Sequence, residues 1–209
     1  MLKFKNNNDF ITLFEQRLSE YTGAPYVVLT DSCTNAIFLS LKYLQKHSYV
    51  PVQATELLIP KRTYISVPQA IINAGFTPIF NKKSWKGKYK IGNLPIYDCA
   101  VGFKKNMYKE GQYQCLSFQQ KKTLGIGKGG AILLDNKEAY DTLKRMAWDG
   151  RDSSVSVIND MHITHGYHMN MIPDDAAKGV LILNQLPEKT KQGTYKDYPN
   201  ISNDININI

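Results

Sequence analysis

Small polar residues that could bind an anion follow the first apolar segment of the chain. The run YVVLT at residues 26–30 is followed, after Asp31, by Ser32, Cys33 and Thr34. An amphipathic helical pattern begins directly after them, so their hydroxyls and backbone amides would face an anion at the N-terminus of that helix. The same spacing suits a helix in which Ser32 serves only as the N-cap. This loop therefore predicts either an anion site or a simple helix cap.

Two further loops carry an aromatic ring and a carboxyl group at the same kind of position. Tyr64 comes just after the apolar run ELLIP at 56–60, where it could stack on a planar ring or pack in the core. Asp98 ends the apolar run LPIYD at 94–98, and a carboxyl group there requires a partner. A protonated pyridine nitrogen or the amides of the following loop would both serve.

A fourth loop contributes a hydroxyl and an amine. Ser117 lies within the apolar run QCLSF at 114–118, and Lys122 precedes the glycine-rich GIGKGG. In a protein with this many lysines, Lys122 is equally well one more surface lysine. Taken together, however, the four loops offer an amine, a carboxyl group, an aromatic ring and several hydroxyls.

The hydrophobic pattern predicts the elements that must position these loops. Helix-period and strand-period segments alternate along the chain, which indicates an α/β fold. We expect a three-layer α/β/α sandwich with a mostly parallel sheet, in which ligands bind at the carboxyl ends of the strands. The expected helices cover 9–22, the segment after residue 33, 66–74, 137–148 and 173–186, and the expected strands cover 26–30, 56–60, 76–80, 94–98, 114–118 and 131–135.

Two glycine motifs and a group of histidines lack the neighbouring residues that their usual functions require. Gly125, Gly127 and Gly130 satisfy GxGxxG, but a dinucleotide-binding fingerprint needs a helix after it, and here a strand follows. A P-loop is excluded because Gly129 stands where Ser or Thr is required. The histidines at positions 162, 165 and 168 have no further ligand at a motif spacing, so no metal site is predicted.

Composition limits the partners and the compartment. The 209 residues carry 26 Lys and Arg against 18 Asp and Glu, a formal net charge of +8, which suits anionic small molecules. Neither a nucleic-acid module nor an apolar run of membrane-spanning length is recognisable, so we expect neither partner and a cytoplasmic protein by default. The three cysteines are expected to be reduced. Because the composition becomes polar after Pro187, residues 187–209 are expected to form a loose tail.

Four segments, taken in order, resemble those of a known family. They are SCTNAI at 32–37, PKRTYIS at 60–66, YDCA at 97–100 and SFQQKKTLGIGKGGAI at 117–132. The series is similar to that of the DegT/DnrJ/EryC1/StrS sugar aminotransferases, which have the aspartate-aminotransferase fold, and HGYHMNMIPDDAAKGVLILNQL at 165–186 extends it. The resemblance implies a large domain at 1–186 that binds pyridoxal 5'-phosphate.

The resemblance also implies a role for each matching residue. Lys122, not Lys121, would be the Schiff-base lysine, and Asp98 would pair with the pyridine nitrogen, so these two would be catalytic. His168 would contact the cofactor phosphate across a subunit boundary. The implied cofactor-binding residues are Cys33, Thr34 and Ser117 at the phosphate, Tyr64 over the ring, and Asp98 and Lys122.

The activity implied by the resemblance is amino transfer to a nucleotide-linked keto-deoxysugar. The donor would be an amino acid such as glutamate, the enzyme a homodimer, and the product a building block of cell-surface polysaccharides or deoxyaminosugars. The sequence departs from the family pattern at Gln119, Lys128 and Val101, where the family usually has His, Glu, and Gln or His.

Two architectural departures leave alternatives open. The region at about 81–93 is expected to be shortened, and the small C-terminal domain of the family is expected to be absent. A non-catalytic homologue that acts as a dimerising or sugar-nucleotide-binding module is therefore one alternative. The other is a sugar dehydratase, a branch in which histidine replaces the Schiff-base lysine, and Lys122 argues against it.

Overall fold

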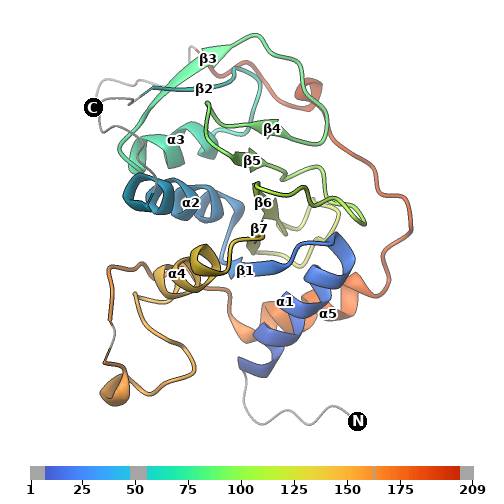
Figure 1. Ribbon diagram of the computed structural model, residues 1–209. Coiled ribbons are helices and arrows are strands. Elements are labelled where there is room, and N and C mark those ends of the chain that lie inside the picture. Colours follow the sequence, from blue (N-terminus) through green and yellow to red (C-terminus); the bar gives the residue numbers. More distant parts are fainter. Residues whose placement is uncertain (1–7, 48–55, 162, 203–209) are drawn as a thin grey trace.

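The computed structural model describes residues 8–47, 56–161 and 163–202 and places helices on both sides of a central sheet (Figure 1). The helices are α1 (Asn8–Thr22), α2 (Cys33–His47), α3 (Ser66–Asn73), α4 (Lys137–Ala147) and α5 (Pro173–Leu183), with short 3-10 helices η1 (Val157–Asn159) and η2 (Tyr195–Asp197). The strands are β1 (Tyr26–Thr30), β2 (Glu56–Pro60), β3 (Thr77–Asn81), β4 (Tyr89–Lys90), β5 (Ile96–Asp98), β6 (Tyr113–Ser117) and β7 (Gly130–Leu134). Every element expected from the hydrophobic pattern is present, and β4 is an addition. None of the helices in these ranges is long and apolar enough to cross a bilayer.

The main sheet has the strand order β1-β7-β6-β5-β4 and is mixed. Only β5 and β6 pair in parallel, while β1–β7, β6–β7 and β4–β5 are antiparallel. The α/β class is confirmed, but the expectation of a mostly parallel sheet is wrong for this sheet. The cause lies in the connections, because parallel neighbours need a long crossover, usually through a helix. Residues 91–95 and 118–129 contain no helix, so the chain returns in the opposite direction.

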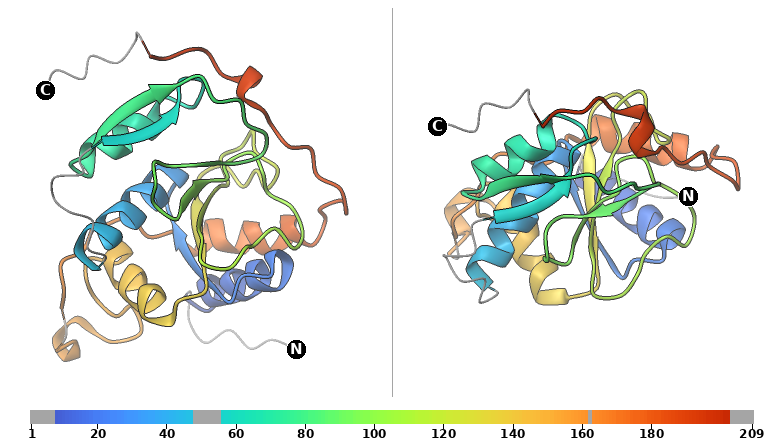
Figure 2. Two further views of the ribbon diagram at one scale, coloured as in Figure 1. Left: turned by 45° about the horizontal axis from the view of Figure 1, so that its top comes forward. Right: turned by 90° about the horizontal axis from the view of Figure 1, so that it is seen from above.

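Helices cover both faces of the main sheet, as the three-layer expectation requires. Figure 2 shows α1 and α5 on one face and α2, α3 and α4 on the other. Side chains of β1 alternate accordingly: Val28 belongs to the cluster that includes α2, whereas Val27 and Leu29 belong to the cluster that includes α1 and α5. A strand that is buried on both faces reads as a continuous apolar run, which explains YVVLT.

Strands β2 and β3 form a separate parallel pair beyond β4 (Figure 1). Its contact with the main sheet includes a hydrogen bond in which the Gly92 amide donates to the Leu58 carbonyl at 2.9 Å. Gly92 has φ of +54°, and an added Cβ would lie 2.7 Å from Leu57 Cδ2. A glycine is therefore required where the turn between β4 and β5 approaches β2.

Residues 187–202, expected as part of a loose tail, form an ordered strap along the molecule (Figure 1). The Gly193 amide donates to the Val101 carbonyl at 3.0 Å, and Ile201 is buried. The expectation of a loose tail is wrong for this segment, because its backbone groups find partners on loops far away in sequence. Residues 203–209 lie outside the described ranges. The division of the chain at residue 186 stays a prediction.

Candidate functional site

The carboxyl ends of three strands meet at one edge of the main sheet. Because β7 runs antiparallel to β1 and β6, and β5 runs parallel to β6, strands β1, β5 and β6 all point the same way. Thr30 at the end of β1 and Ser117 at the end of β6 both lie opposite Gly130. Asp98 at the end of β5 lies opposite Cys115. Three of the four predicted loops therefore start from the same edge.

The loop before α2 is organised around the Asp31 side chain. Asp31 Oδ1 accepts hydrogen bonds from Asn35 Nδ2 at 2.7 Å and from Ser32 Oγ at 3.1 Å. Ser32 Oγ in turn accepts from the Asn35 amide at 3.2 Å, so Ser32 caps the helix. The two readings of this loop are compatible, since the cap serves Asn35 and the preceding amides of Cys33 and Thr34 lie at the helix N-terminus.

Thr34 and Cys33 differ in their surroundings. The Thr34 hydroxyl shares a hydrogen bond with the Ser66 hydroxyl at 2.7 Å, which ties α2 to the start of α3. Burial raises the pKa of the Cys33 thiol well above its ordinary value, and the Asp98 carboxylate raises it further. Cys33 is therefore a neutral thiol that does not repel an anion.

Asp98 is a buried carboxyl group with two donors. The residue is 6% exposed, Oδ2 accepts from the Tyr89 hydroxyl at 2.6 Å, and Oδ1 accepts from the Ala100 amide at 2.9 Å. Burial raises the pKa of Asp98, while the two hydrogen bonds and the Lys122 ammonium lower it. Tyr89 also shares a hydrogen bond with the Thr63 hydroxyl. The net effect is a raised pKa for a carboxyl group that two donors fix at the end of β5.

Lys122, Ser117 and Tyr64 complete the edge. Lys122 is half-buried, and its Nζ donates to the Tyr198 hydroxyl of the strap at 3.3 Å. Ser117 is half-buried, and its hydroxyl accepts from the Gln119 amide at 3.5 Å. Tyr64 is 59% exposed, so it is not a core residue and its ring stays accessible to a ligand.

His168 has a different partner from the other predicted residues. Its side chain is 83% exposed, and Nδ1 lies 3.0 Å from Asp149 Oδ2. The next residue, Met169, accepts a hydrogen bond from the Asp31 amide at 2.9 Å, which places this segment beside the α2 loop. His162 lies outside the described residues. Among the residues that are described, no group of three or more His, Cys, Asp or Glu side chains is placed to hold a metal ion.

Sequence reasoning missed two tyrosines that contact the predicted residues. Tyr89 donates to Asp98, and Tyr198 accepts from Lys122. Tyr89 lies in a lysine-rich stretch without strand periodicity, and Tyr198 lies in a segment with the composition of a tail. The available signal was an aromatic residue within each of these polar stretches, which is more than a solvated segment needs.

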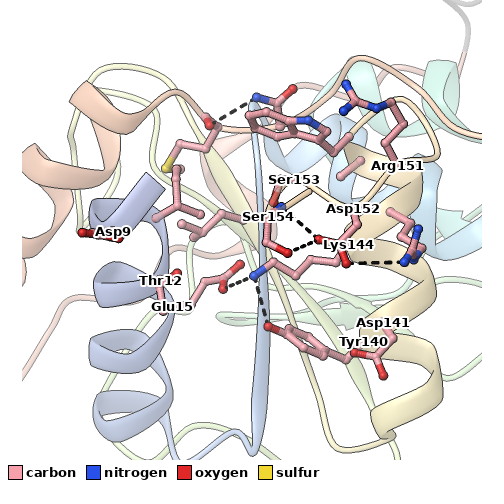
Figure 3. A pocket seen from close by; sticks show the side chains of 17 residues that line it. Asp9, Thr12, Glu15, Tyr140, Asp141, Lys144, Arg151, Asp152, Ser153 and Ser154 are labelled. Carbon is pink, nitrogen blue, oxygen red and sulfur yellow. Dashed lines mark hydrogen bonds and ion pairs between the residues drawn. The ribbon is translucent and has the colours of Figure 1, made fainter. Parts of the chain in front are cut away.

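A cavity of about 620 Å³ lies between α1 and α4 (Figure 3). Its described lining includes none of the predicted cofactor-binding residues. Glu15 of α1 and Lys144 of α4 point toward each other, with Lys144 Nζ 2.8 Å from Glu15 Oε2 and 3.2 Å from the Tyr140 hydroxyl. Burial raises the pKa of Glu15, and Lys144 opposes that effect. The pair connects the helices of opposite faces.

We expect Lys144→Met to lower the free energy of unfolding by about 2 kcal/mol at neutral pH, because it removes the cation that pairs with the buried Glu15 carboxylate. Glu15 is 9% exposed on its side chain and Lys144 is 32% exposed. With a raised pKa in the folded state, Glu15 takes up a proton more readily folded than unfolded. The loss should therefore shrink as pH falls through that raised pKa.

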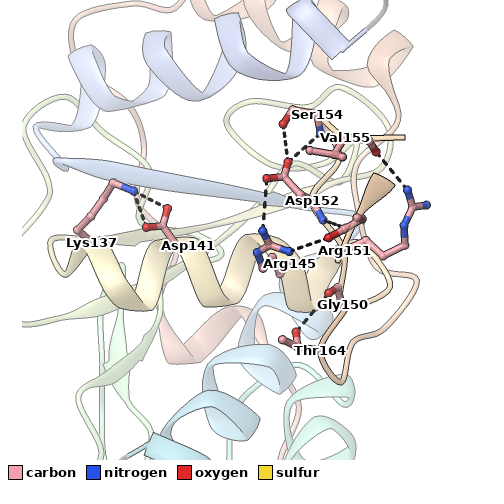
Figure 4. Close-up of polar contacts among 10 residues, drawn as sticks. Lys137, Asp141, Arg145, Gly150, Arg151, Asp152, Ser154, Val155 and Thr164 are labelled. Atoms are coloured by element: carbon pink, nitrogen blue, oxygen red, sulfur yellow. Dashed lines mark hydrogen bonds and ion pairs between the residues drawn. The ribbon is translucent and has the colours of Figure 1, made fainter. Parts of the chain in front are cut away.

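Lys137→Met on the same helix is the matched control. Lys137 pairs with Asp141, and both side chains are more than half exposed (Figure 4). Its loss should cost no more than about 0.5 kcal/mol. Urea denaturation of both variants at several pH values measures the difference. Equal losses for the two variants, or a Lys144→Met loss that grows toward acid, would contradict the assignment.

The groups at the sheet edge fit one kind of small molecule. A half-buried amine, a buried carboxylate and the N-terminus of α2 lie on loops of the same edge. They would respectively bind an aldehyde carbon, a protonated ring nitrogen and a phosphate. An ideal Cβ on Gly130 would lie 2.5 Å from the Cys33 amide nitrogen, so the absence of a side chain there lets the α2 loop sit against β7.

Two curated proteins are similar to this chain in sequence. Spore coat polysaccharide biosynthesis protein SpsC of Bacillus subtilis (strain 168) is 24% identical to this chain in an alignment 229 residues long. The alignment covers 86% of this chain and 57% of SpsC. GDP-perosamine synthase of Escherichia coli O157:H7 is 25% identical to this chain in an alignment 223 residues long. The alignment covers 86% of this chain and 59% of that enzyme. The chain thus spans less than two thirds of the length of these curated relatives.

Solved structures show the same fold. AtS13 from Actinomadura melliaura superposes with a TM-score of 0.71 at 21% identity, over 84% of this chain and 59% of AtS13. Another structure with this fold contains its bound cofactor, pyridoxamine phosphate. The model of the DegT/DnrJ/EryC1/StrS aminotransferase family matches residues 3–84 and 96–196. A match over most of the chain shows that this protein belongs to the DegT/DnrJ/EryC1/StrS aminotransferase family, whose cofactor is pyridoxal phosphate.

Proposed function

We propose that this chain binds pyridoxal phosphate at the carboxyl edge of its main sheet and transfers an amino group to a nucleotide-linked keto-deoxysugar. The observation that carries the proposal is the convergence of Asp98, Ser117 and the α2 loop at the carboxyl ends of β5, β6 and β1. Lys122 lies on the loop that follows Ser117. The names of SpsC and GDP-perosamine synthase support the sugar class of substrate. The proposal extends to glutamate or a similar amino acid as the donor.

Lys122 and Asp98 would each have a separate chemical role in amino transfer. When bound, the cofactor supplies an electron sink for a carbanion at the donor Cα. The Lys122 amine would hold the cofactor aldehyde carbon covalently and, once displaced, move the proton from the donor Cα. Asp98, fixed by Tyr89 and Ala100, would keep the ring nitrogen protonated.

The remaining residues would orient the cofactor. The amides of Cys33 and Thr34 at the start of α2 and the Ser117 hydroxyl would hold the phosphate. Tyr64, exposed beyond β2, would cover one face of the ring. These groups bind and align, and so the proton transfer falls to Lys122 alone.

A homodimer is part of the proposal, and the segment after α4 supports it. Arg145 holds this segment through Asp152 at 3.4 Å and Asp160 at 3.6 Å (Figure 4). The segment nevertheless presents a group of exposed apolar side chains, which suits contact with a second copy. His168 follows it and would reach the partner's cofactor phosphate. The exposed apolar residues are Val157, Ile158, Met161 and Ile163.

The proposal is tested by one absorbance experiment on the purified chain. Adding pyridoxal phosphate should produce the visible band of a cofactor bound covalently to lysine, and adding glutamate should remove that band as the cofactor takes up the amino group. A nucleotide-linked keto-deoxysugar should then restore it. No band after cofactor addition would overturn the proposal.

A non-catalytic binding module is the second candidate. It is favoured by the hydrogen bond from Lys122 to Tyr198, which engages the amine that amino transfer requires. The same titration separates the two functions. A cofactor band that glutamate leaves unchanged supports the module, whereas complete conversion to the amine form excludes it.

A further inference from the structure

The strap, residues 187–202, is anchored next to the candidate site. Arg62 Nη1 donates to the Tyr198 carbonyl at 2.8 Å, and the Ile201 amide donates to the Lys61 carbonyl at 2.9 Å. The Tyr198 ring packs against Trp85 with 5.6 Å between ring centroids. Both anchors lie just after β2, so the strap crosses from the α5 side of the molecule to the loop that carries Tyr64 (Figure 1).

These anchors bring the Tyr198 side chain into hydrogen-bond contact with the Lys122 amine. Lys122 Nζ donates to the Tyr198 hydroxyl at 3.3 Å and lies 5.9 Å from the ring centroid. Burial raises the pKa of the Tyr198 hydroxyl, and the nearby groups Asp98, Asp197, Cys33 and Tyr64 raise it further. The hydroxyl is therefore neutral, and it shares its surroundings with the residues of the proposed cofactor set.

We propose that the strap is a displaceable cover of the cofactor site, in which Tyr198 and pyridoxal phosphate compete for the place beside Lys122. The inference rests on the proposed function. A carbonyl carbon must approach Lys122 Nζ to bonding distance, and the phenol of Tyr198 already occupies a side of that atom. The Tyr198 ring and the cofactor ring cannot fill the same space beside Lys122, so cofactor binding requires the strap to move away.

The strength of the contacts agrees with a cover that can be displaced. At 3.3 Å the bond from Lys122 to Tyr198 is longer than a typical hydrogen bond. Tyr198 and Arg62 are both only half-buried, so water can replace their hydrogen bonds when the strap lifts. The bond between Lys122 and the cofactor aldehyde forms with release of one water, and the phosphate contacts at the start of α2 would offset what the strap loses.

The first arm of the test measures the reactivity of Lys122 without cofactor. The full chain is methylated with formaldehyde and borohydride, and the modification of Lys122 is compared with that of its exposed neighbour Lys121 by peptide mass spectrometry. Tyr198→Ala should raise the ratio by about fivefold or more, since the amine loses its partner and its cover. Arg62→Ala, which frees the strap but keeps Tyr198, should raise it in the same direction. Lys196→Ala, at an exposed strap position, is the control and should leave it unchanged.

The second arm titrates pyridoxal phosphate and follows both the visible band and trypsin cleavage of the strap. Tyr198→Ala should bind cofactor about fivefold more tightly than the unaltered chain. Cofactor should also speed cleavage after Lys189 and Lys191 in the unaltered chain. Weaker cofactor binding by Tyr198→Ala and Arg62→Ala, or cofactor that protects the strap from trypsin, would overturn the competition.

The two arms separate this inference from the proposed function. Unchanged Lys122 reactivity in both Tyr198→Ala and Arg62→Ala, with native circular dichroism, overturns the cover whatever the cofactor does. Increased reactivity in variants that never develop the visible band leaves the cover over Lys122 standing and removes the proposed function instead.

Discussion

Lys122→Ala is expected to abolish the covalent binding of pyridoxal phosphate and to lower amino transfer by at least about a hundredfold, the low end of the contribution of a general base. The variant keeps Asp98, the α2 loop and Ser117, so cofactor should still bind without a covalent bond. The visible band of the lysine adduct measures the change, and borohydride trapping followed by peptide mapping locates the modified residue.

Lys121→Ala is the matched control for this prediction. Lys121 is the adjacent residue with the same charge, but its side chain is exposed, whereas Lys122 Nζ reaches the strap tyrosine. The control should keep the visible band. If Lys121→Ala loses the band and Lys122→Ala retains it, the assignment of the cofactor lysine is wrong by one residue.

Gly130→Ala is expected to lower the free energy of unfolding by about 3 kcal/mol and to weaken cofactor binding by at least about tenfold. An ideal Cβ at Gly130 would lie 2.4 Å from the Ser32 carbonyl carbon and 2.5 Å from the Cys33 nitrogen. These are backbone atoms, so the α2 loop itself must shift. The shift would move the amides proposed to bind phosphate.

Gly111→Ala separates this steric effect from the general cost of replacing a glycine. Gly111 has φ of +72°, and an added Cβ would meet nothing within 4 Å, so the change should cost about 1 kcal/mol from backbone strain alone. Denaturant unfolding and cofactor titration of both variants measure the difference. Equal losses of stability, or normal cofactor affinity in Gly130→Ala, would show that the close approach of β7 to the α2 loop is unimportant.

Much of the fold could be predicted because apolar runs and helix periods are local properties of the sequence. The run YVVLT coincides with β1, and the helix expected at 9–22 coincides with α1 within one residue. The direction of β7 could not be predicted in the same way. Its pairing with both β1 and β6 depends on where the chain turns back after Ser117, which a pattern of side chains does not specify.

In the candidate site, too, some residues could be predicted from the sequence and others could not. Asp98 and Ser117 could be placed at strand ends from the sequence alone, and β5 and β6 end at these residues. Tyr89 could not be found, because β4 is only two residues long and lies among lysines. Tyr198 was hidden for another reason, since its partners Arg62 and Lys122 are remote in sequence, and an aromatic residue in a polar segment does not identify its partners.

The anchoring of the strap has a consequence for the order in which the chain folds. Arg62 and Tyr198 are 136 residues apart, so their hydrogen bond closes one of the longest loops in the protein. Closing such a loop early would cost conformational entropy before other contacts could repay it. The sheet and its two helical layers should therefore form first, and a ribosome-bound chain would present an open sheet edge until Tyr198 has been synthesised. Covering the Lys122 amine is thus expected to be among the last steps of folding.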